Sequence, residues 1–388
     1  MKGNTMRVIT DKNKCTGCMA CVNICPKHCI HAKSDDEGFI YPDIDKSECI
    51  ECGLCKNLCQ GSHTPYQKGT AYACINNDEK ARNESSSGGI FTLIAEYTLN
   101  QNGIVFGAAF DENLNVHHIK AENKEQLKKL RGSKYVQSNT GSILRQAKEA
   151  LTNGKLVLFS GTPCQISGLK AFLGKEYDNL ITQDIVCHGV PSPMVWQEYL
   201  KHQSFVNNKD INKNTPPSFR KKDSGWKHYS VSLSFSDNSD CVILHHDDLF
   251  MKSFLKDLSL RPSCYQCPVK SKKCESDITL ADFWGIENIL PEMYDDKGTS
   301  LVLVNSEKGN FLFNAISDKM RYKQVDFDTA VKFNSSISQS ASIPKKRDKF
   351  MKMAKNGSFC KAVQICTKES LYRRLVWKAK SIISKIKN

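Results

Sequence analysis

The spacing of the cysteines near the start of the chain constrains its fold more than any other feature. Four cysteines stand in the run CTGCMACVNICP, and four more stand in CIECGLCKNLC. They are Cys15, Cys18, Cys21 and Cys25 in the first run, and Cys49, Cys52, Cys55 and Cys59 in the second. Both runs follow the order C-x2-C-x2-C-x3-C, so this segment is an internal repeat.

Disulfides and zinc are the two ordinary alternatives for cysteines that lie so close together. Disulfides form in oxidising compartments, and the leader MKGNTMRVITDKNK has no apolar export segment. Zinc sites usually pair two separated C-x2-C units, without a third cysteine three positions on and a fourth four further. The spacing, with Pro26 after the first run, is instead that of a bacterial-type ferredoxin with two 4Fe-4S clusters.

The ferredoxin pattern also predicts which cysteines share a cluster, because the last cysteine of each run completes the cluster of the other. One cluster is expected on Cys15, Cys18, Cys21 and Cys59, and the other on Cys49, Cys52, Cys55 and Cys25. Gly17 and Gly53 lie inside the loops, where the backbone must approach the cluster closely. Gln60 replaces the usual second proline, which removes no ligand. Cys29 is expected to be a small buried residue.

Length and composition set outer limits on the function. A chain of 388 residues exceeds one ordinary core, and its mean hydropathy of −0.45, without an apolar run of membrane length, argues against a spanning segment. Eighteen cysteines favour a reducing, cytoplasmic setting. The formal charge of +14 attracts acidic partners, but filled clusters would lower it. No motif that combines aromatic and basic residues supports nucleic-acid binding.

Beyond the cysteine repeat, the sequence pattern predicts an α/β core. An expected helix over 90–99 and a strand over 104–110 begin an alternation that is typical of a mainly parallel sheet. Between Ser218 and His246 the period changes to two, which predicts an inserted antiparallel hairpin. The expected parts are an α+β ferredoxin-like two-cluster domain over 1–62, a larger α/β domain in two parts over 63–154 and 155–345, and a basic tail over 346–388.

Two stretches suit the binding of phosphate groups. SSSGGIF places hydroxyls and free N–H groups, over residues 85–89, at the start of an expected helix, which attracts anions. FSGTPCQ does the same at a strand-to-helix turn, with Pro163 at the first helical position. Ordinary helix capping is the alternative for each stretch alone. Together, and beside clusters that must pass electrons on, they favour a dinucleotide cofactor, although no G-x-G-x-x-G follows a strand.

A third set of cysteines is more dispersed. Its five members are Cys264, Cys267 and Cys274 in CYQCPVKSKKC, and Cys164 and Cys187 at the ends of predicted strands. Because cofactors bind at the carboxyl ends of strands in open α/β sheets, four of these five are candidates for a further cluster. Burial without ligation is the alternative. Four other cysteines have no spacing that argues for ligation: Cys74, Cys241, Cys360 and Cys366.

Taken together, the motifs resemble the coenzyme F-420 hydrogenase/dehydrogenase beta-subunit family. Besides the double cysteine run, the resemblance rests on ESSSGGIFT, LRGSKYVQS, SGTPCQISGL, CHGVPSPMVWQEYL and CYQCPVKSKKCESDITLADFWGI, and it extends over about residues 12–290. Ala281 stands where the family commonly has glycine, in a structural turn. The resemblance implies an iron–sulfur flavoprotein with FAD and an additional 4Fe-4S cluster, so the α/β domain is expected to bind flavin.

The resemblance also implies site residues. Those for FAD are Ser86, Ser87, Gly88, Gly89, Thr92, Lys134, Tyr135, Gln137, Ser138, Gly161, Thr162, Pro163 and Gln165. The ligands of the third cluster are Cys164, Cys187, Cys264 and Cys267, with Cys274 in reserve. His188 and Asp282 are candidates for a catalytic role beside the flavin, and a satisfied polar role in the core is the alternative for both.

The expected function is that of an iron–sulfur flavin-dependent oxidoreductase. Electrons pass from a ferredoxin-type donor protein through the clusters to FAD and on to a soluble two-electron substrate. Many bacterial relatives are associated with surface-polysaccharide synthesis, which is one expected setting. One alternative is a subunit that reduces or oxidises the deazaflavin coenzyme F-420 within a hydrogenase or dehydrogenase complex. Another is an electron-carrier module without flavin.

The basic tail leaves a further question open. On a helix, Leu371, Leu375, Ile382 and Ile386 would form an apolar stripe opposite lysines and arginines, as in helices that lie on membranes. Docking of this helix on its own protein is the alternative. The expected location is the cytoplasm, with peripheral contact at the inner membrane face left open, and the sequence assigns no oligomeric state.

Overall fold

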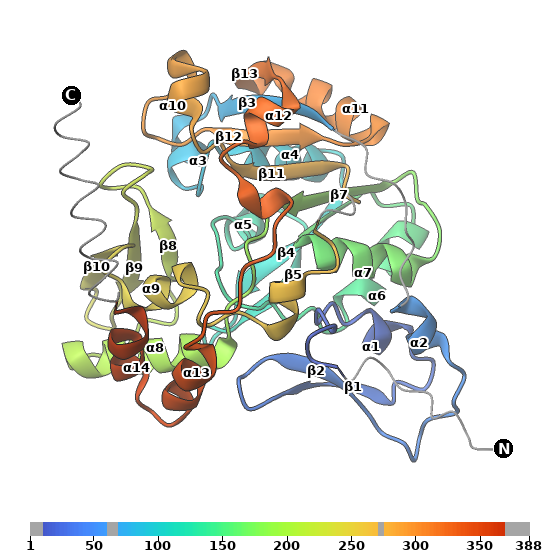
Figure 1. The fold of residues 1–388 in the computed structure, drawn as a ribbon. Helices are drawn as coiled ribbons and strands as arrows, with labels where there is room; N and C mark the ends of the chain where they lie inside the picture. The colour runs from blue at the N-terminus through green and yellow to red at the C-terminus, as the bar shows by residue number, and fades with distance from the viewer. Residues whose placement is uncertain (1–10, 60–68, 271–274, 369–388) are drawn as a thin grey trace.

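An eight-stranded sheet forms the centre of the molecule (Figure 1). The computed structural model describes residues 11–59, 69–270 and 275–368. The strands of the sheet, in spatial order, are β13 (Met320–Val325), β3 (Thr70–Asn76), β12 (Ser300–Val304), β11 (Ile278–Asp282), β7 (Leu180–Ile185), β6 (Val157–Gly161), β4 (Ile104–Phe110) and β5 (Val116–Ala121).

The strand directions correct the prediction of a mainly parallel sheet. Among the described strands, β11, β7, β6 and β4 form a parallel block. The pairs that involve β12, β3 and β13 on one side, and β5 on the other, are antiparallel. A regular alternation of strands and helices does not fix these directions, since a short connection such as that between β4 and β5 returns the chain antiparallel. The parallel block carries the candidate site.

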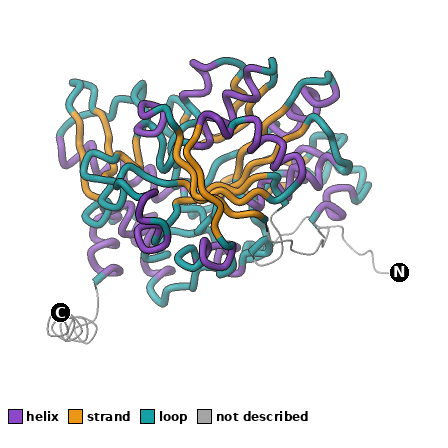
Figure 2. Tube along the Cα trace, turned by 90° about the horizontal axis from the view of Figure 1, so that it is seen from above, coloured by secondary structure: helices purple, strands orange, loops and turns teal. Residues whose placement is uncertain are grey.

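Helices cover both faces of this sheet, as the view from above shows (Figure 2). One layer consists of α4 (Ile90–Asn100), α5 (Lys124–Lys128) and α11 (Glu307–Ala315). The opposite layer consists of α6 (Ile143–Thr152) and α7 (Pro163–Leu173) at the parallel strands, with α10 (Ile286–Ile289) and α12 (Phe327–Val331) towards the antiparallel end. Short elements in the connections are α3 (Glu79–Asn83), η2 (Pro291–Met293), η3 (Ser317–Lys319) and η4 (Ser335–Ile337).

The predicted antiparallel insertion is confirmed, and it has a third strand. β9 (Ser230–Ser234) pairs with β10 (Asp240–Leu244) on one side and β8 (Ser218–Lys221) on the other. A separate hydrophobic core joins it to four helices, which are α8 (Pro193–Asn207), α9 (Leu249–Leu255), α13 (Arg347–Lys355) and α14 (Phe359–Thr367).

The first part of the predicted basic tail belongs to this core. Phe350 and Met351 of α13 and Phe359 and Val363 of α14 are buried, because each helix has an apolar face that needs a partner. The tail as predicted therefore begins too early. The apolar stripe expected farther on lies outside the described residues. Within the described part of the chain, no helix is both long and apolar enough to cross a bilayer.

The cysteine repeat forms a small unit beside α6 and α7, at the lower right of Figure 1. We call residues 11–59 the ferredoxin unit. Its elements are the antiparallel strands β1 (Ile30–Ser34) and β2 (Ile40–Ile44), and two short helices that begin within the cysteine runs, α1 (Ala20–Ile24) and α2 (Leu54–Leu58). Ala20 and Ile24 pack in one hydrophobic cluster with α6 and α7.

Arginines from distant parts of the chain hold the ferredoxin unit in place. Arg145 of α6 donates from Nε to the carbonyl oxygen of Asn23 (2.8 Å) and from Nη2 to that of Val22 (2.7 Å). Arg347 of α13 forms two hydrogen bonds with the carboxylate of Glu37, at 3.1 and 2.5 Å. Because guanidinium groups bind through several directed donors, these contacts fix orientation as well as position.

Candidate functional site

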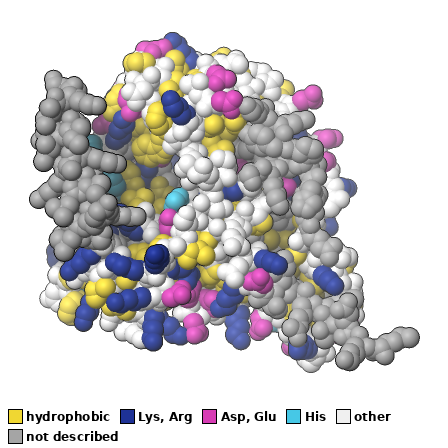
Figure 3. All heavy atoms as spheres, viewed as in Figure 1, with side chains coloured by type: hydrophobic (Ala, Val, Ile, Leu, Met, Phe, Trp, Pro, Cys, Tyr) yellow, Lys and Arg dark blue, Asp and Glu magenta, His cyan; other side chains and the backbone are white. Residues whose placement is uncertain are grey.

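A central cavity of about 570 Å³ lies at the carboxyl ends of the parallel strands β6, β7 and β11. The last residues of these three strands, Gly161, Ile185 and Asp282, all line it. The space-filling view shows a hollow on the face seen in Figure 1, lined in part by hydrophobic side chains (Figure 3). This edge of an open α/β sheet is where such folds bind ligands.

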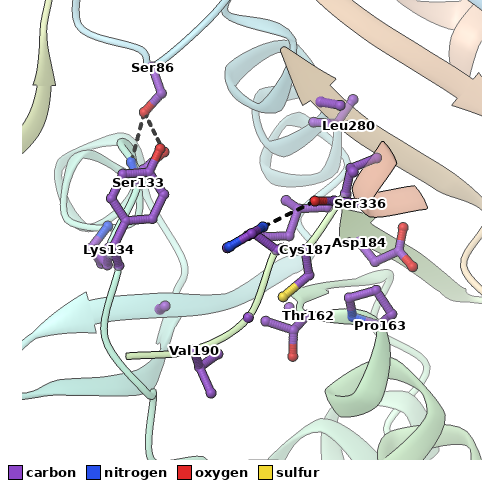
Figure 4. Close-up of a pocket in the computed structure, with 18 of the residues that line it drawn as sticks. Ser86, Ser133, Lys134, Thr162, Pro163, Asp184, Cys187, Val190, Leu280 and Ser336 are labelled. Carbon is purple, nitrogen blue, oxygen red and sulfur yellow. Dashed lines mark hydrogen bonds between the residues drawn. The ribbon is translucent and has the colours of Figure 1, made fainter. Parts of the chain in front are cut away.

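The serine turn, which we define as residues 85–89, borders the cavity at the start of α4. The Oγ atom of Ser86 accepts hydrogen bonds from the backbone N–H and the hydroxyl of Ser133, both at 2.8 Å (Figure 4). Ser87 donates from Oγ to the carbonyl oxygen of Thr299 at 3.0 Å. The protein's own hydrogen bonds therefore connect the serine turn to two other loops, those of Ser133 and Thr299.

Two of the residues predicted for FAD do not line the cavity. A Cβ atom on Gly88 would lie 2.4 Å from the carbonyl oxygen of Cys74 and 2.7 Å from the backbone nitrogen of Ser300. Gly88 therefore lies against the backbone of β3 and β12, where a side chain would not fit. Thr92 lies one turn into α4 and is 1 % exposed. Gly89, with a φ of 85°, does line the cavity.

The segment 134–138 lines a second side of the cavity with the four residues predicted there. Lys134 donates from Nζ to three carbonyl oxygens of its own loop, those of Leu130, Arg131 and Gly132, at 2.9–3.2 Å. Burial lowers the pKa of Lys134 to about 7. Through these three hydrogen bonds, the side chain of Lys134 stabilises the loop to which it belongs.

The other polar residues of this segment connect it to its surroundings. Gln137 accepts from the backbone N–H of Ile40 in the ferredoxin unit at 3.0 Å, while the hydroxyl of Ser138 lies 2.7 Å from Nδ1 of His118. Burial lowers the pKa of His118 to about 4, so its imidazole is neutral at pH 7. Gln137 therefore joins the cavity wall directly to the ferredoxin unit.

The turn between β6 and α7 forms a third side, and all four predicted residues line the cavity. Pro163 is the first residue of α7, and Oε1 of Gln165 accepts from the backbone N–H of Thr162 at 2.9 Å. This is the local capping that the sequence offered as the alternative. The residues of this turn cap α7 and also line the cavity, so helix capping and ligand binding do not exclude each other.

Four dispersed cysteines also face the cavity. They are Cys164 at the start of α7, Cys187 after β7, and Cys264 and Cys267 on and just after η1 (Pro262–Gln266). Burial raises the pKa of Cys164 to about 12 and that of Cys264 to about 11, and the charges of neighbouring thiols in the group act in the same direction. The reserve residue Cys274 lies outside the described residues.

In the ferredoxin unit, thiol charges act on one another within the two predicted sets, with Cys49 as the exception. The pKa of Cys21 is raised by burial first and then by the charges of Cys18, Cys59 and Cys15. The pKa of Cys55 is raised by burial and by the charges of Cys52 and Cys25. Since such effects weaken with distance, Cys21 lies near its three predicted co-ligands, and Cys55 lies near Cys52 and Cys25, while Cys49 acts on the pKa of Cys29.

The glycines of the two cysteine loops have the backbone that the prediction requires. Gly17 and Gly53 both have a φ of 75°, which side chains disfavour. Cys29 is buried as expected, and its Sγ lies 3.4 Å from that of Cys25. No described group of three or more Cys, His, Asp or Glu side chains is close enough for a single metal ion. A 4Fe-4S cube is larger than an ion and spreads its ligands more widely.

The two catalytic candidates line the cavity but are engaged by other side chains. The imidazole of His188 lies 2.5 Å from Oδ1 of Asp257 and 3.2 Å from the hydroxyl of Ser336, the bond drawn in Figure 4. Asp282 forms an ion pair with Arg220 at 3.0 Å. Both positions are thus compatible with the core role that the sequence offered as the alternative.

No motif in the sequence predicted one group of cavity-lining residues, Arg220, Tyr229 and Trp284. The guanidinium carbon of Arg220 lies 4.0 Å from the ring centre of Tyr229 and 5.5 Å from that of Trp284. A guanidinium over aromatic rings forms a flat wall, and the charge of this guanidinium is paired with Asp282. Arg220 and Tyr229 lie on or beside the strands of the insertion, and only the fold brings them to the cavity.

Asp184, near the end of β7, is a second residue that the sequence analysis missed. Its side chain is buried, and its Oδ1 has no hydrogen-bond partner within the described residues. Burial raises the pKa of Asp184 to about 7. A carboxyl group whose pKa is raised in this way is protonated more readily than an exposed one.

The shift at Asp184 predicts a specific pH dependence of stability. The folded chain holds the proton of Asp184 more tightly than the unfolded chain does. The contribution of this proton to the free energy of unfolding is therefore fully present below about pH 4 and is lost as the pH rises through about 7. In Asp184→Asn this dependence disappears. Urea unfolding of both proteins across this range should show the parent losing stability relative to the variant as the pH rises. A constant difference would contradict the shift.

Comparisons with known proteins give the family. Sequence models of the coenzyme F420 hydrogenase/dehydrogenase beta subunit match residues 71–145 with the N-terminal part and 154–329 with the C-terminal part. The model of a 4Fe-4S dicluster domain matches residues 14–61. The comparison with curated proteins gave no match.

Among solved structures, the chain is similar to one in a xenon-derivatised F420-reducing [NiFe] hydrogenase complex from Methanosarcina barkeri. That chain is 18% identical, with a TM-score of 0.46, over 77% of this chain and 91% of its own length. The two matched parts of the beta-subunit family together account for most of the sequence after the cysteine repeat. The chain belongs to the coenzyme F420 hydrogenase/dehydrogenase beta-subunit family and carries a 4Fe-4S dicluster domain ahead of it.

Proposed function

We propose that the chain is an iron–sulfur flavoprotein that carries single electrons to a flavin and delivers them in pairs to a soluble substrate. The ferredoxin unit would hold two 4Fe-4S clusters, the cavity cysteines a third, and the rest of the cavity FAD. Family membership itself establishes iron–sulfur electron transfer of the hydrogenase or dehydrogenase type. The flavin, the third cluster and the substrate are the parts that this proposal adds.

The observation that carries the proposal is that one cavity collects residues from the predicted FAD site, from the predicted third cluster and from the first cysteine loop of the ferredoxin unit. Thr16 and Gly17 of the first cysteine loop line it, and so do the four dispersed cysteines, the serine turn and the turn before α7. Electron tunnelling weakens steeply with distance, so redox centres must lie near one another. A single cavity with these walls meets that requirement.

The chemistry of the cysteine groups fits iron–sulfur clusters. Thiols that are both buried and crowded lose protons with difficulty, as the raised pKa of Cys164, Cys187 and Cys264 shows. Iron supplies the positive charge that stabilises several thiolates at one place. The backbone N–H of Val190, 3.5 Å from Sγ of Cys264, is the kind of donor that such a thiolate accepts.

The walls near the serine turn fit the phosphates of FAD. Ser86 accepts both hydrogen bonds from Ser133, so its own hydroxyl hydrogen is left for an acceptor such as a phosphate oxygen. The first N–H groups of α4 and α7 add positive dipole ends at the same cavity. A volume of about 570 Å³ falls within the range of cofactor pockets.

A bound flavin supplies a centre that exchanges electrons one or two at a time. The chain's own contribution lies in position and charge. Arg220, ion-paired with Asp282, offers with Tyr229 and Trp284 a flat wall that suits a planar substrate. Asp184 offers a proton near neutral pH. Such groups orient the substrate and balance the charge of the transferred electrons.

The deazaflavin coenzyme is a substrate that the same observations support equally well. It is planar and anionic, and the family takes its description from enzymes that use it. Oxidation of the reduced deazaflavin by the purified, loaded protein distinguishes this alternative from other substrates. The electron carrier without flavin is distinguished by absorbance, because oxidised flavin has resolved bands above the broad iron–sulfur absorption.

The partners that we propose follow from the ferredoxin unit. A ferredoxin-type protein would donate or accept electrons at its exposed side, where Cys52 and Cys59 are accessible. A catalytic subunit of a larger complex is the other candidate, since the similar structure comes from such a complex.

The third cluster predicts a count of iron. Anaerobically prepared protein should hold about twelve irons per chain, four for each cluster. The double variant Cys264→Ala, Cys267→Ala should hold about eight, because it loses one cluster. Cys241→Ala, a half-buried cysteine on β10 away from the cavity, is the matched control and should keep them all. A double variant that retains every iron would remove the third cluster from the proposal.

The proposed flavin site predicts that FAD can be lost while the iron–sulfur clusters stay in place. A Cβ atom on Gly161 would lie 3.0 Å from Oε1 of Gln165 at the cavity wall, so Gly161→Val should narrow the turn and shed FAD. The iron content should stay at the parent value. Gly107→Ala on β4, where a Cβ has ordinary contacts with Leu130, is the control. Unchanged flavin content in Gly161→Val, measured after acid release, would show that FAD does not use this turn.

A further inference from the structure

Arg261 is a completely buried arginine at the base of the loop that carries Cys264. Its backbone N–H donates to the carbonyl oxygen of Val190 at 3.0 Å, and its own carbonyl oxygen accepts from the N–H of Cys264 at 2.9 Å. The backbone of Arg261 is therefore fixed to the wall of the central cavity. Its side chain points away from this loop, towards the ferredoxin unit.

The guanidinium of Arg261 contacts the first cysteine loop of the ferredoxin unit directly. Nε donates to the carbonyl oxygen of Cys15 at 2.9 Å, Nη1 donates to that of Ile40 at 3.1 Å, and Nη2 lies 3.7 Å from Sγ of Cys15. The ring of Tyr41 lies 4.0 Å from the guanidinium carbon and covers one side. A Cβ on Gly17 would lie 3.0 Å from the same carbon, so the backbone of the first cysteine loop packs directly against the guanidinium group.

The same loop also touches the helix that begins at the cavity cysteines. A Cβ on Gly168 of α7 would lie 2.8 Å from Sγ of Cys18. Cys164 is the second residue of that helix. The first cysteine loop and the cavity cysteines are therefore connected in two ways, through α7 and through Arg261.

A fixed positive charge beside a cluster ligand has a defined physical effect. Reduction adds one electron to a cluster, and no bond needs to form or break. A nearby cation and a hydrogen bond to the ligand sulfur stabilise the added charge, which raises the reduction potential. Arginine keeps its charge at all accessible pH values, and burial strengthens its field.

We propose that Arg261 is a positioning residue that raises the potential of the cluster on Cys15, Cys18, Cys21 and Cys59, and makes it the one that exchanges electrons with the cavity. The inference rests on the proposed clusters of the ferredoxin unit. It goes beyond them by assigning an order to the two clusters of the ferredoxin unit. Electrons that enter from a donor reach the Cys15 cluster second, and pass from it to the cavity. Each step moves one electron from a reduced cluster to an oxidised one.

The test is an anaerobic potentiometric titration of the full-length, loaded protein with dithionite, followed by EPR. The signal of the Cys15 cluster is assigned by its loss in Cys18→Ala. In Arg261→Gln, which removes the charge, its midpoint should shift to more negative potential, while the other signals stay in place. Iron content is measured on each sample, so that a lost cluster is not mistaken for a shifted one.

Arg145→Gln is the matched control, because Arg145 also docks the ferredoxin unit but donates to the carbonyl oxygens of Val22 and Asn23. Its potentials should match the parent's. Arg261→Lys keeps the charge but cannot make all three contacts, so its shift should have the same sign and be smaller. If Arg261→Gln loses iron, this variant decides the matter.

An unshifted Cys15 midpoint in a loaded Arg261→Gln or Arg261→Lys protein would overturn the inference, as would an equal shift in Arg145→Gln. The proposed function is judged separately, by the iron and flavin contents of the parent.

Discussion

The hydrogen bonds of three arginines that hold the ferredoxin unit against the rest of the chain are the interaction on which the rest of the structure depends. Arg145, Arg261 and Arg347 come from α6, from the loop before η1 and from α13, yet all three bind backbone or carboxylate oxygens of the first 40 residues. Together with the packing of Ala20 and Ile24 on α6 and α7, they fix the position of the cysteine loops relative to the sheet. Because tunnelling depends on distance, docking of this unit decides whether its clusters can serve the cavity at all.

The second requirement is an edge of the sheet where several chain segments end together. The parallel block of β6, β7 and β11 supplies it, since each of these strands delivers its last residue to the cavity. The antiparallel insertion then closes the open side with Arg220 and Tyr229. Sites built in this way draw residues from many parts of the sequence, as four cysteines from three separate segments illustrate.

Local signals in the sequence predicted the local structure well. The helix expected over 90–99 is α4, the strand over 104–110 is β4, and the change of period after Ser218 marks the insertion. Eleven of the thirteen residues that the resemblance assigned to FAD line the central cavity, as do all four cysteines assigned to a third cluster. These residues lie together because short motifs encode turns and helix starts, and those features determine which residues face the cavity; their binding of FAD or of a cluster stays a prediction.

Features that depend on distant parts of the chain could not be predicted from local motifs. Gly88 lies against β3 and β12, a contact with residues 74 and 300 that its own motif does not reveal. The mixed strand directions and the burial of α13 and α14 have the same origin. Arg261 and Arg220 carry no motif, and their importance depends on partners far away in sequence.

The most direct test of the whole account is an anaerobic stopped-flow experiment that follows the flavin absorbance band. The parent and Cys52→Ala, which loses a ligand of the more distant cluster, are mixed with reduced ferredoxin or with a small chemical reductant. We predict that the variant keeps its flavin and is still bleached by the small reductant, but is no longer reduced by ferredoxin. Equal rates with ferredoxin in the two proteins would contradict the account, because the clusters would then lie off the electron path.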